Sequence, residues 1–133
     1  MNLAAGLDTR PYRLDLPASL EWIESDLPAM IEEKERVLGD AQPRCRLKRI
    51  KADLTDPAAR VAMLREAVGS TTPVLVITEG LLIYLDDAQV RALAADLLAE
   101  PSIRWWLLDR LENRCWCIRS CEPRRSSGAC RGF

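Results

Sequence analysis

Five acidic side chains occupy positions where they could act together on a ligand. Asp8, Asp26, Asp53, Glu79 and Asp109 each lie at, or just after, the end of a short apolar segment. Carboxylates accept hydrogen bonds from hydroxyl and amino groups, and they attract cations. The spacing therefore predicts a site for a ligand that carries hydroxyl groups or positive charge, provided that the fold brings these segment ends together.

The absence of histidine limits the chemistry of that site. The chain has 133 residues and no His. This excludes Ser-His-Asp and Cys-His catalysis, His acid–base chemistry and zinc sites built on paired histidines. We therefore predict no metal, and no side chain is assigned as catalytic.

The apolar segments alternate between strand-like and helix-like patterns from residue 1 to 109. After a first strand that ends near Gly6, strands are predicted at 20–26, 47–52, 73–78 and 103–108, and helices at 28–38, at 57–69 and after Asp86. The run 73–78 is continuously apolar, which is typical of a strand buried on both faces. Such alternation predicts an α/β fold with a mostly parallel sheet and helices on both faces. Ligands of such sheets bind beyond the carboxyl ends of the strands.

The spacing of Gly6 and Asp26 points to an adenosine ligand. An acid about 20 residues after a tight turn is the arrangement that holds a ribose. Alternatively, Asp26 caps the helix that starts at Pro28. A dinucleotide such as NAD needs its pyrophosphate near the turn, where Asp8 would repel it and where the glycine pattern is incomplete. S-adenosyl-L-methionine is cationic and has no phosphate, so it suits these acids better. An NAD-type oxidoreductase stays as a lesser alternative.

Four segments resemble the motifs of the leucine carboxyl methyltransferase family, which also includes bacterial polyketide O-methyltransferases. They are NLAAGLDTRPYRL (2–14), WIESDLP (22–28), KADLTD (51–56) and TEGLLIYL (78–85). The four occur in the family's order. The family commonly has Gly where this chain has Ala4.

The resemblance implies a Rossmann-like class I methyltransferase core, incomplete and with about five strands, that binds S-adenosyl-L-methionine. Gly6 would lie under the methionine part of the cofactor, and Asp26 would hold the ribose hydroxyls. Asp53 would accept from the adenine amino group beside the Leu54 backbone. Glu79 would lie near the methionine end. Alternatively, Asp53 is only a turn acid and Glu79 only a helix N-cap.

The implied reaction is methyl transfer to a carboxyl or hydroxyl oxygen of a small molecule or a protein carboxylate. A carboxylate is already ionised at neutral pH and needs no general base. Tyr84 could face the substrate or only pack. Family members are longer at both ends, so we expect residues 1–109 to be a partial cofactor-binding domain of a truncated form. The alternative is a non-catalytic remnant that acts as an interaction module.

Residues 110–133 differ sharply in composition from the rest. They contain six Arg, two Glu and four of the five cysteines, so their charge is positive whereas residues 1–109 are acidic. A zinc site, an Arg-rich nucleic-acid arm and a disulfide are alternatives for this tail, but a non-native or disordered segment fits its composition better. With no signal peptide or membrane span readable, we expect a cytoplasmic protein with no nucleic-acid or membrane partner. Open sheet edges predict self-association.

Overall fold

The protein is an α/β structure in which short strands alternate with helices. The computed structural model describes residues 1–68 and 72–109, so the expected helix end at Gly69 and every interpretation of the tail 110–133 lie outside the described residues. The elements in chain order are β1 (Asn2–Leu3), α1 (Arg10–Arg13), β2 (Glu21–Asp26), α2 (Pro28–Leu38), β3 (Arg46–Lys51), α3 (Pro57–Ala67), β4 (Val74–Thr78), the 3-10 helix η1 (Leu82–Tyr84), α4 (Asp87–Ala99) and β5 (Ile103–Leu108).

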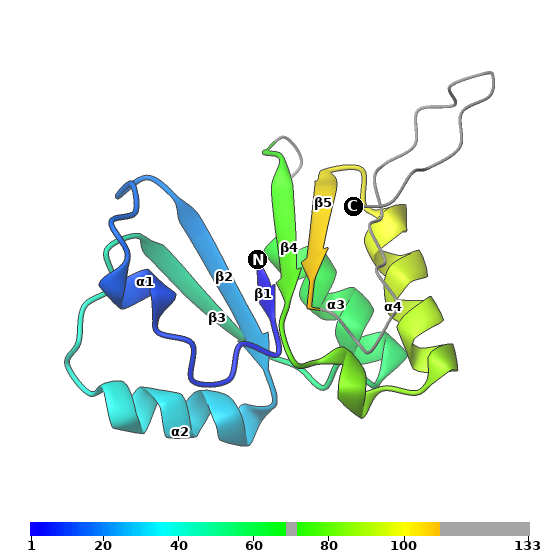
Figure 1. Ribbon diagram of the computed structural model, residues 1–133, viewed down its shortest axis with the longest axis horizontal. Coiled ribbons are helices and arrows are strands. Elements are labelled where there is room, and N and C mark those ends of the chain that lie inside the picture. Colours follow the sequence, from blue (N-terminus) through cyan, green and yellow to red (C-terminus); the bar gives the residue numbers. More distant parts are fainter. Residues whose placement is uncertain (69–71, 110–133) are drawn as a thin grey trace.

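The strands form one parallel sheet with the order β3-β2-β1-β4-β5 (Figure 1). Every pairing between neighbouring strands is parallel. The chain runs outward from β1 to β3 on one side, then returns to continue with β4 and β5 on the other. This reversal next to β1 is the topological switch point at which ligands of open α/β sheets bind. The predicted Rossmann-like fold with five strands is confirmed.

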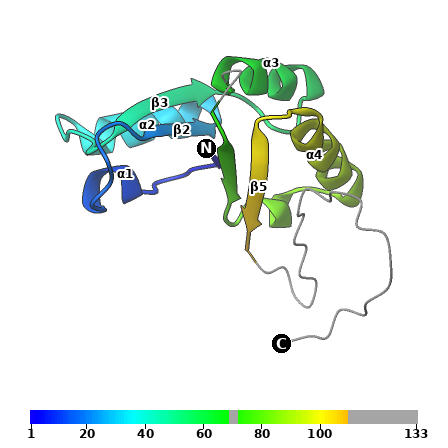
Figure 2. The ribbon, with the colours of Figure 1, turned by 90° about the horizontal axis from the view of Figure 1, so that it is seen from above.

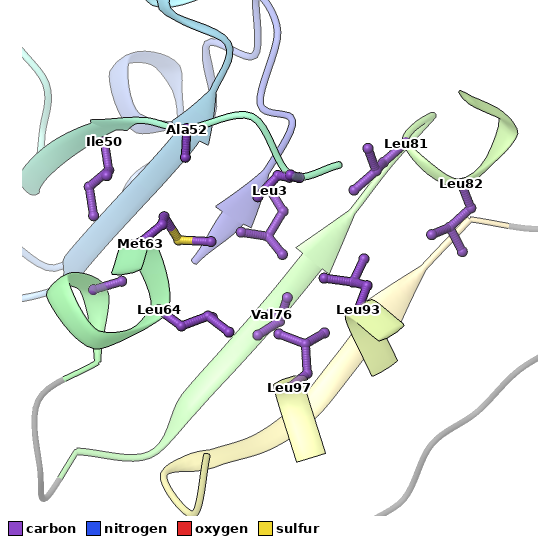
Figure 3. Close-up of a cluster of buried hydrophobic side chains, with 12 residues drawn as sticks. Leu3, Ile50, Ala52, Met63, Leu64, Val76, Leu81, Leu82, Leu93 and Leu97 are labelled. Carbon is purple, nitrogen blue, oxygen red and sulfur yellow. The ribbon is translucent and has the colours of Figure 1, made fainter. Parts of the chain in front are cut away.

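One face of the sheet carries the main apolar core. The strand register puts Leu3, Ile50 and Val76 on the same side, because Leu3 pairs with Ser25 and Thr78, and Ser25 pairs with Ile50. Side chains of α3 and α4 pack against them, and Met63, Leu64, Leu93 and Leu97 are all at most 3% exposed. Figure 3 shows these side chains pointing from the two helices toward the strands. This core fixes the sheet to the two helices that follow β3 and β4.

The opposite face is covered over β2 and β3 by α1 and α2. Glu24 lies on this face and is fully buried, and its carboxylate is 2.9 Å from the ammonium of Lys34 in α2. Arg49 of β3 donates to the same carboxylate at 3.1 Å and to the Tyr12 hydroxyl of α1. Removing the Glu24 charge would leave the buried Lys34 ammonium uncompensated, which is strongly destabilising. Helices therefore cover both faces (Figure 2), as predicted.

Two details of the fold differ from the sequence interpretation. The strand β4 is not buried on both faces along its length, because Leu75 is 41% exposed on the face away from α3 and α4. The short helices α1 and η1 were not predicted, since three or four residues are too few to show a helical period. In the described residues, no helix is both long and apolar enough to cross a membrane.

Candidate functional site

A cavity of about 560 Å³ opens beyond the carboxyl ends of β1, β2, β3 and β4. All five residues predicted for the site line it: Gly6, Asp26, Asp53, Leu54 and Glu79. The remaining wall is mainly apolar and includes Leu27 and Met30 from the start of α2. A cavity of this volume, with a mainly apolar wall and a few convergent polar groups, is typical of small-ligand sites. The fold thus brings together residues that are up to 73 positions apart in the chain.

Asp26 is fixed at the end of β2 by two backbone N–H groups. Gly6 donates to its Oδ2 at 2.7 Å, and Leu27 donates to its Oδ1 at 2.8 Å. Gly6 has a φ of 47°, a left-handed conformation that glycine adopts without a steric penalty. The alternative that Asp26 caps α2 is wrong, because the N-cap of α2 is Leu27 and no side chain caps it. Asp26 instead joins β2 to the turn that follows β1.

Ala4 introduces strain into the same turn. Its φ is 53°, a conformation that favours glycine. The side chain lines the cavity. Ala4 stands where the family commonly has Gly, and its backbone has the left-handed conformation that glycine favours.

Asp53 lies in the turn between β3 and α3. Its Oδ1 accepts hydrogen bonds from the Thr55 backbone N–H at 2.9 Å and from the Thr55 hydroxyl at 2.7 Å. These bonds hold the pKa of Asp53 below its ordinary value. Asp53 is therefore a turn acid, as the alternative proposed, and it also lines the cavity. Within the described residues its Oδ2 accepts no hydrogen bond.

Leu54 links this turn to the helices on the core face. Its side chain is 6% exposed, and its carbonyl oxygen accepts from Nη1 of Arg60 at 2.8 Å. Arg60 in α3 is itself buried and donates to Asp96 of α4 at 2.6 Å. The Asp53–Leu54 turn is thus anchored to both α3 and α4 through one guanidinium.

Glu79 follows β4 and does not cap a helix, since the N-caps of η1 and α4 are Leu81 and Asp86. Its Oε2 accepts from Nη2 of Arg10 at 2.6 Å. Arg10 lies 69 residues away, at the start of α1, and the sequence interpretation missed it. The only sequence signal was a single cation two positions after Asp8, inside the first motif.

Asp109 repeats the arrangement of Asp26 on the other half of the sheet. The backbone N–H of Gly80, which has a φ of 69°, donates to Asp109 Oδ2 at 2.7 Å. These two strand-end acids thus each accept from a glycine in the turn after the neighbouring strand, Asp26 from Gly6 and Asp109 from Gly80. Tyr84, 79% exposed, also lines the cavity. Together these features can bind a ligand that has an apolar ring, hydroxyl groups and positive charge.

Comparison with known proteins gives a match over most of the chain. The family model of leucine carboxyl methyltransferases matches residues 1–98. A protein of Mycolicibacterium smegmatis is 48% identical over 97 residues, which are 68% of this chain and 31% of that protein. A protein of Mycobacterium avium is 41% identical over 77% of this chain and 34% of its own length. A protein of Parafrankia sp. is 36% identical over 80% of this chain and 36% of its own length.

All three relatives carry the name "Putative S-adenosyl-L-methionine-dependent methyltransferase". The chain spans about a third of the length of these relatives. The matched region contains the four motifs and every predicted site residue. On the sequence match over residues 1–98, this chain belongs to the leucine carboxyl methyltransferase family.

Proposed function

We propose that this chain binds S-adenosyl-L-methionine in the cavity beyond the strand ends, as the cofactor-binding part of a methyltransferase. The observation that carries the proposal is the convergence of five residues from four separate motifs on one cavity at the switch point of the sheet. The relatives' names support the same cofactor. We also propose that residues 1–109 act as one cofactor-binding unit.

The residues present fit this cofactor. A carboxylate has about four lone-pair sites, and the two oxygens of Asp26 use one each on Gly6 and Leu27. The remaining sites can accept the two ribose hydroxyls. The Oδ2 of Asp53 would accept from the adenine amino group, with the Leu54 backbone beside the ring. Leu27 and Met30 supply apolar surface for the same ring.

The cofactor, when bound, supplies a methyl group on a cationic sulfur. The contribution of this chain is to bind and orient it. We propose an oxygen acceptor, either a carboxyl or a hydroxyl group, on a small molecule or a protein. An ionised carboxylate needs no proton removed before it is methylated. Positioning is then the main catalytic effect required of the protein.

Calorimetry of the full chain with S-adenosyl-L-methionine tests the proposal. We expect saturable binding that weakens about tenfold or more in Asp26→Asn and Asp53→Ala, because each loses a charge-assisted hydrogen bond. Asp15→Ala is the matched control, since Asp15 is exposed and lies outside the cavity. Melting curves show whether each variant is folded.

Three results would separate the alternatives. Folded wild-type chain that does not bind the cofactor would contradict the proposal. Binding without methyl transfer to any carboxylate or hydroxyl acceptor would favour an interaction module. A rise in NADH fluorescence on titration with the chain would favour the dinucleotide alternative.

A further inference from the structure

The strand β3 forms one outer edge of the sheet and, within the described residues, pairs only with β2 (Figure 1). Successive residues of a strand direct their backbone groups to opposite sides in the plane of the sheet. The N–H groups of Arg46 and Ala52 donate toward β2. The N–H and C=O groups of Leu47, Arg49 and Lys51 therefore point away from it. This edge offers a row of backbone donors and acceptors to an added strand.

The side chains along this edge are basic on both faces of the strand. Arg46 and Lys48 lie on the same face as the core residue Ile50, because side chains two positions apart share a face. Arg49 and Lys51 lie on the opposite face, which α1 and α2 cover. An extended chain that paired with β3 would therefore meet positive charge on both of its own faces.

The cations of this edge are available to a partner. Arg44 and Arg46 are exposed, and they form no ion pair with the residues that the structure describes. The backbone N–H of Arg44 donates to the Pro11 carbonyl at 2.8 Å, which fixes the chain just before the strand. Lys48 and Lys51 pair with carboxylates of α3 and α2 that are more than half exposed. Such exposed pairs contribute little to stability, so both lysines can turn to another anion at small cost.

A second cavity, of about 370 Å³, lies beside the same strand. Leu47 and Arg49 line it from β3, and Tyr12 and Glu35 line it from α1 and α2. Arg49 is 3.1 Å from the buried Glu24 but 3.8 Å from Glu35, which is 52% exposed. An acidic side chain that enters the cavity can therefore replace Glu35 on the guanidinium without disturbing the buried pair.

We propose that the edge of β3 is a docking site for an acidic segment of a partner protein, which binds in an extended conformation as an additional strand. Addition of a strand to a free sheet edge is a common mode of peptide recognition, in which main-chain hydrogen bonds give affinity and side-chain pockets give specificity. The outward backbone groups of Leu47, Arg49 and Lys51 supply the hydrogen bonds. Arg44 and Arg46 supply the charge.

The charge of the edge distinguishes between classes of partner. Basic side chains oppose pairing with an ordinary strand or with a second copy of β3, but they attract an acidic strand. The phosphates of a nucleic acid would also contact the cations. They would leave the outward backbone groups of Leu47, Arg49 and Lys51 without the continuous pairing that a strand provides. The free backbone edge therefore favours a peptide.

Three capped peptides that carry a fluorophore test the proposal on the full chain. The first is built from Glu and Thr, since Thr favours strands. The second has the same sequence but N-methyl groups on its peptide nitrogens, which removes the backbone donors and keeps the charge. The third has Lys in place of Glu. Fluorescence anisotropy should show saturable binding of the first peptide and none of the third. The second should bind about tenfold more weakly or worse, because several main-chain hydrogen bonds are lost.

Substitutions in the chain separate charge from backbone pairing. Arg46→Glu should weaken binding of the first peptide about fivefold or more, because attraction becomes repulsion. Arg91→Glu is the matched control, at an exposed position of α4, and should have no effect. Lys51→Pro removes an outward N–H that an edge strand can lack, whereas Lys51→Gln removes the same charge and keeps the N–H. The proline variant should therefore bind the peptide more weakly than the glutamine variant. Melting curves show whether each variant is folded.

The results either support the docking site or overturn it. A folded wild-type chain that does not bind the acidic peptide would overturn it. Equal binding of the N-methylated peptide, or equal affinities of Lys51→Pro and Lys51→Gln, would reduce the contact to charge alone and overturn strand addition. A single-stranded RNA that binds more tightly than the peptide and is weakened by Arg46→Glu would assign the edge to nucleic acid instead. Selective binding of the unmethylated acidic peptide, weakened by Arg46→Glu but not by Arg91→Glu, supports the proposal.

Discussion

Ala4 and its neighbours show how much of the site depends on backbone conformation. Ala4 has a φ of 53°, whereas Ala5 has no such conformation and is 6% exposed in the core. A left-handed conformation costs an L-residue roughly 1–2 kcal/mol. Glycine avoids this cost. It also makes the unfolded chain more flexible, which lowers the free energy of unfolding by about 0.4–1 kcal/mol.

Ala4→Gly is therefore expected to raise the free energy of unfolding by about 0.5 kcal/mol, the difference between these two effects. Ala5→Gly is the matched control, because it adds the same freedom without relieving strain and removes a buried methyl group. It should lower stability by about 1 kcal/mol or more. Urea unfolding measures both variants. A loss of stability in Ala4→Gly equal to that in Ala5→Gly would show that the turn is not strained.

Asp53 offers a residue-scale test through its ionisation. Thr55 lowers its pKa from the ordinary 3.8 by a side-chain and a backbone hydrogen bond. A lowered pKa favours the ionised form in the folded state, so this contribution to stability is present above the unfolded pKa and is lost as the pH falls through the folded one. Thr55→Val removes the hydroxyl and keeps the backbone bond.

In Thr55→Val the pKa of Asp53 should therefore rise part of the way toward 3.8, measured by NMR titration of its carboxyl carbon. Thr72→Val, at an exposed position away from Asp53, should leave it unchanged. An unchanged value in Thr55→Val would mean that the hydroxyl does not hold the carboxylate.

At the scale of elements, helix starts were the most predictable features. The helix α2 spans Pro28–Leu38 as the sequence indicated, and Asp56 caps α3 by accepting from the Ala58 N–H at 2.9 Å. These signals are local, since the cap, the proline and the first turn lie within a few residues of one another.

The N-cap of α4 allows a test of how much such a local signal contributes to stability. Asp86 accepts from the Gln89 N–H at 2.8 Å, and the Gln89 side chain accepts from the Asp86 N–H at 2.9 Å, which is a capping box. Asp86→Ala should lower the free energy of unfolding by about 1 kcal/mol. Asp87→Ala removes an acid from the first turn without breaking the box, so it should cost only about 0.3–1 kcal/mol, from the helix dipole. Equal losses in thermal unfolding would show that the box adds nothing beyond charge.

What the sequence could not predict depends on long-range contacts. The acids Asp26, Asp53 and Glu79 could be singled out because each lies at or just after the end of a strand, and parallel strands end at one edge of the sheet. The full set, with Gly6 and Leu54, came from the resemblance to the family motifs. The partner of each was not identifiable. Arg10 and Glu79 are 69 residues apart, and Gly80 and Asp109 are 29 apart. Nothing local to Asp26 distinguished a helix cap from an acceptor for Gly6, since both need the same residue type.

At the scale of the whole molecule, the two edges of the sheet differ in protection. The edge strand β3 has the sequence RLKRIK, and its four basic residues disfavour pairing with another strand. The other edge strand, β5, has the sequence IRWWLL with a single charge. In the described part of the chain β5 pairs only with β4. Within residues 1–68 and 72–109 this edge is unpaired, and an unpaired apolar edge is a template for strand pairing.

The face beside β5 adds apolar surface to that edge. Leu75, Trp105 and Leu107 are 41%, 57% and 54% exposed, and they lie on one face, because Leu75 pairs with Trp105 and Ile77 with Leu107. A second copy of the chain that pairs along β5 would bury this face together with the open edge. Self-association through β5 is thus the expected behaviour, rather than association through β3.

Leu107→Lys tests this expectation by placing a charge on the apolar face without altering the buried core. We expect it to raise the dissociation constant of the dimer about tenfold or more in sedimentation velocity, because two copies would bring two unpaired charges into the interface. Val37→Lys is the matched control, since Val37 is 58% exposed on α2, away from β5. A wild-type chain that stays monomeric at high concentration, or an equal effect of the two substitutions, would show that β5 is not the contact.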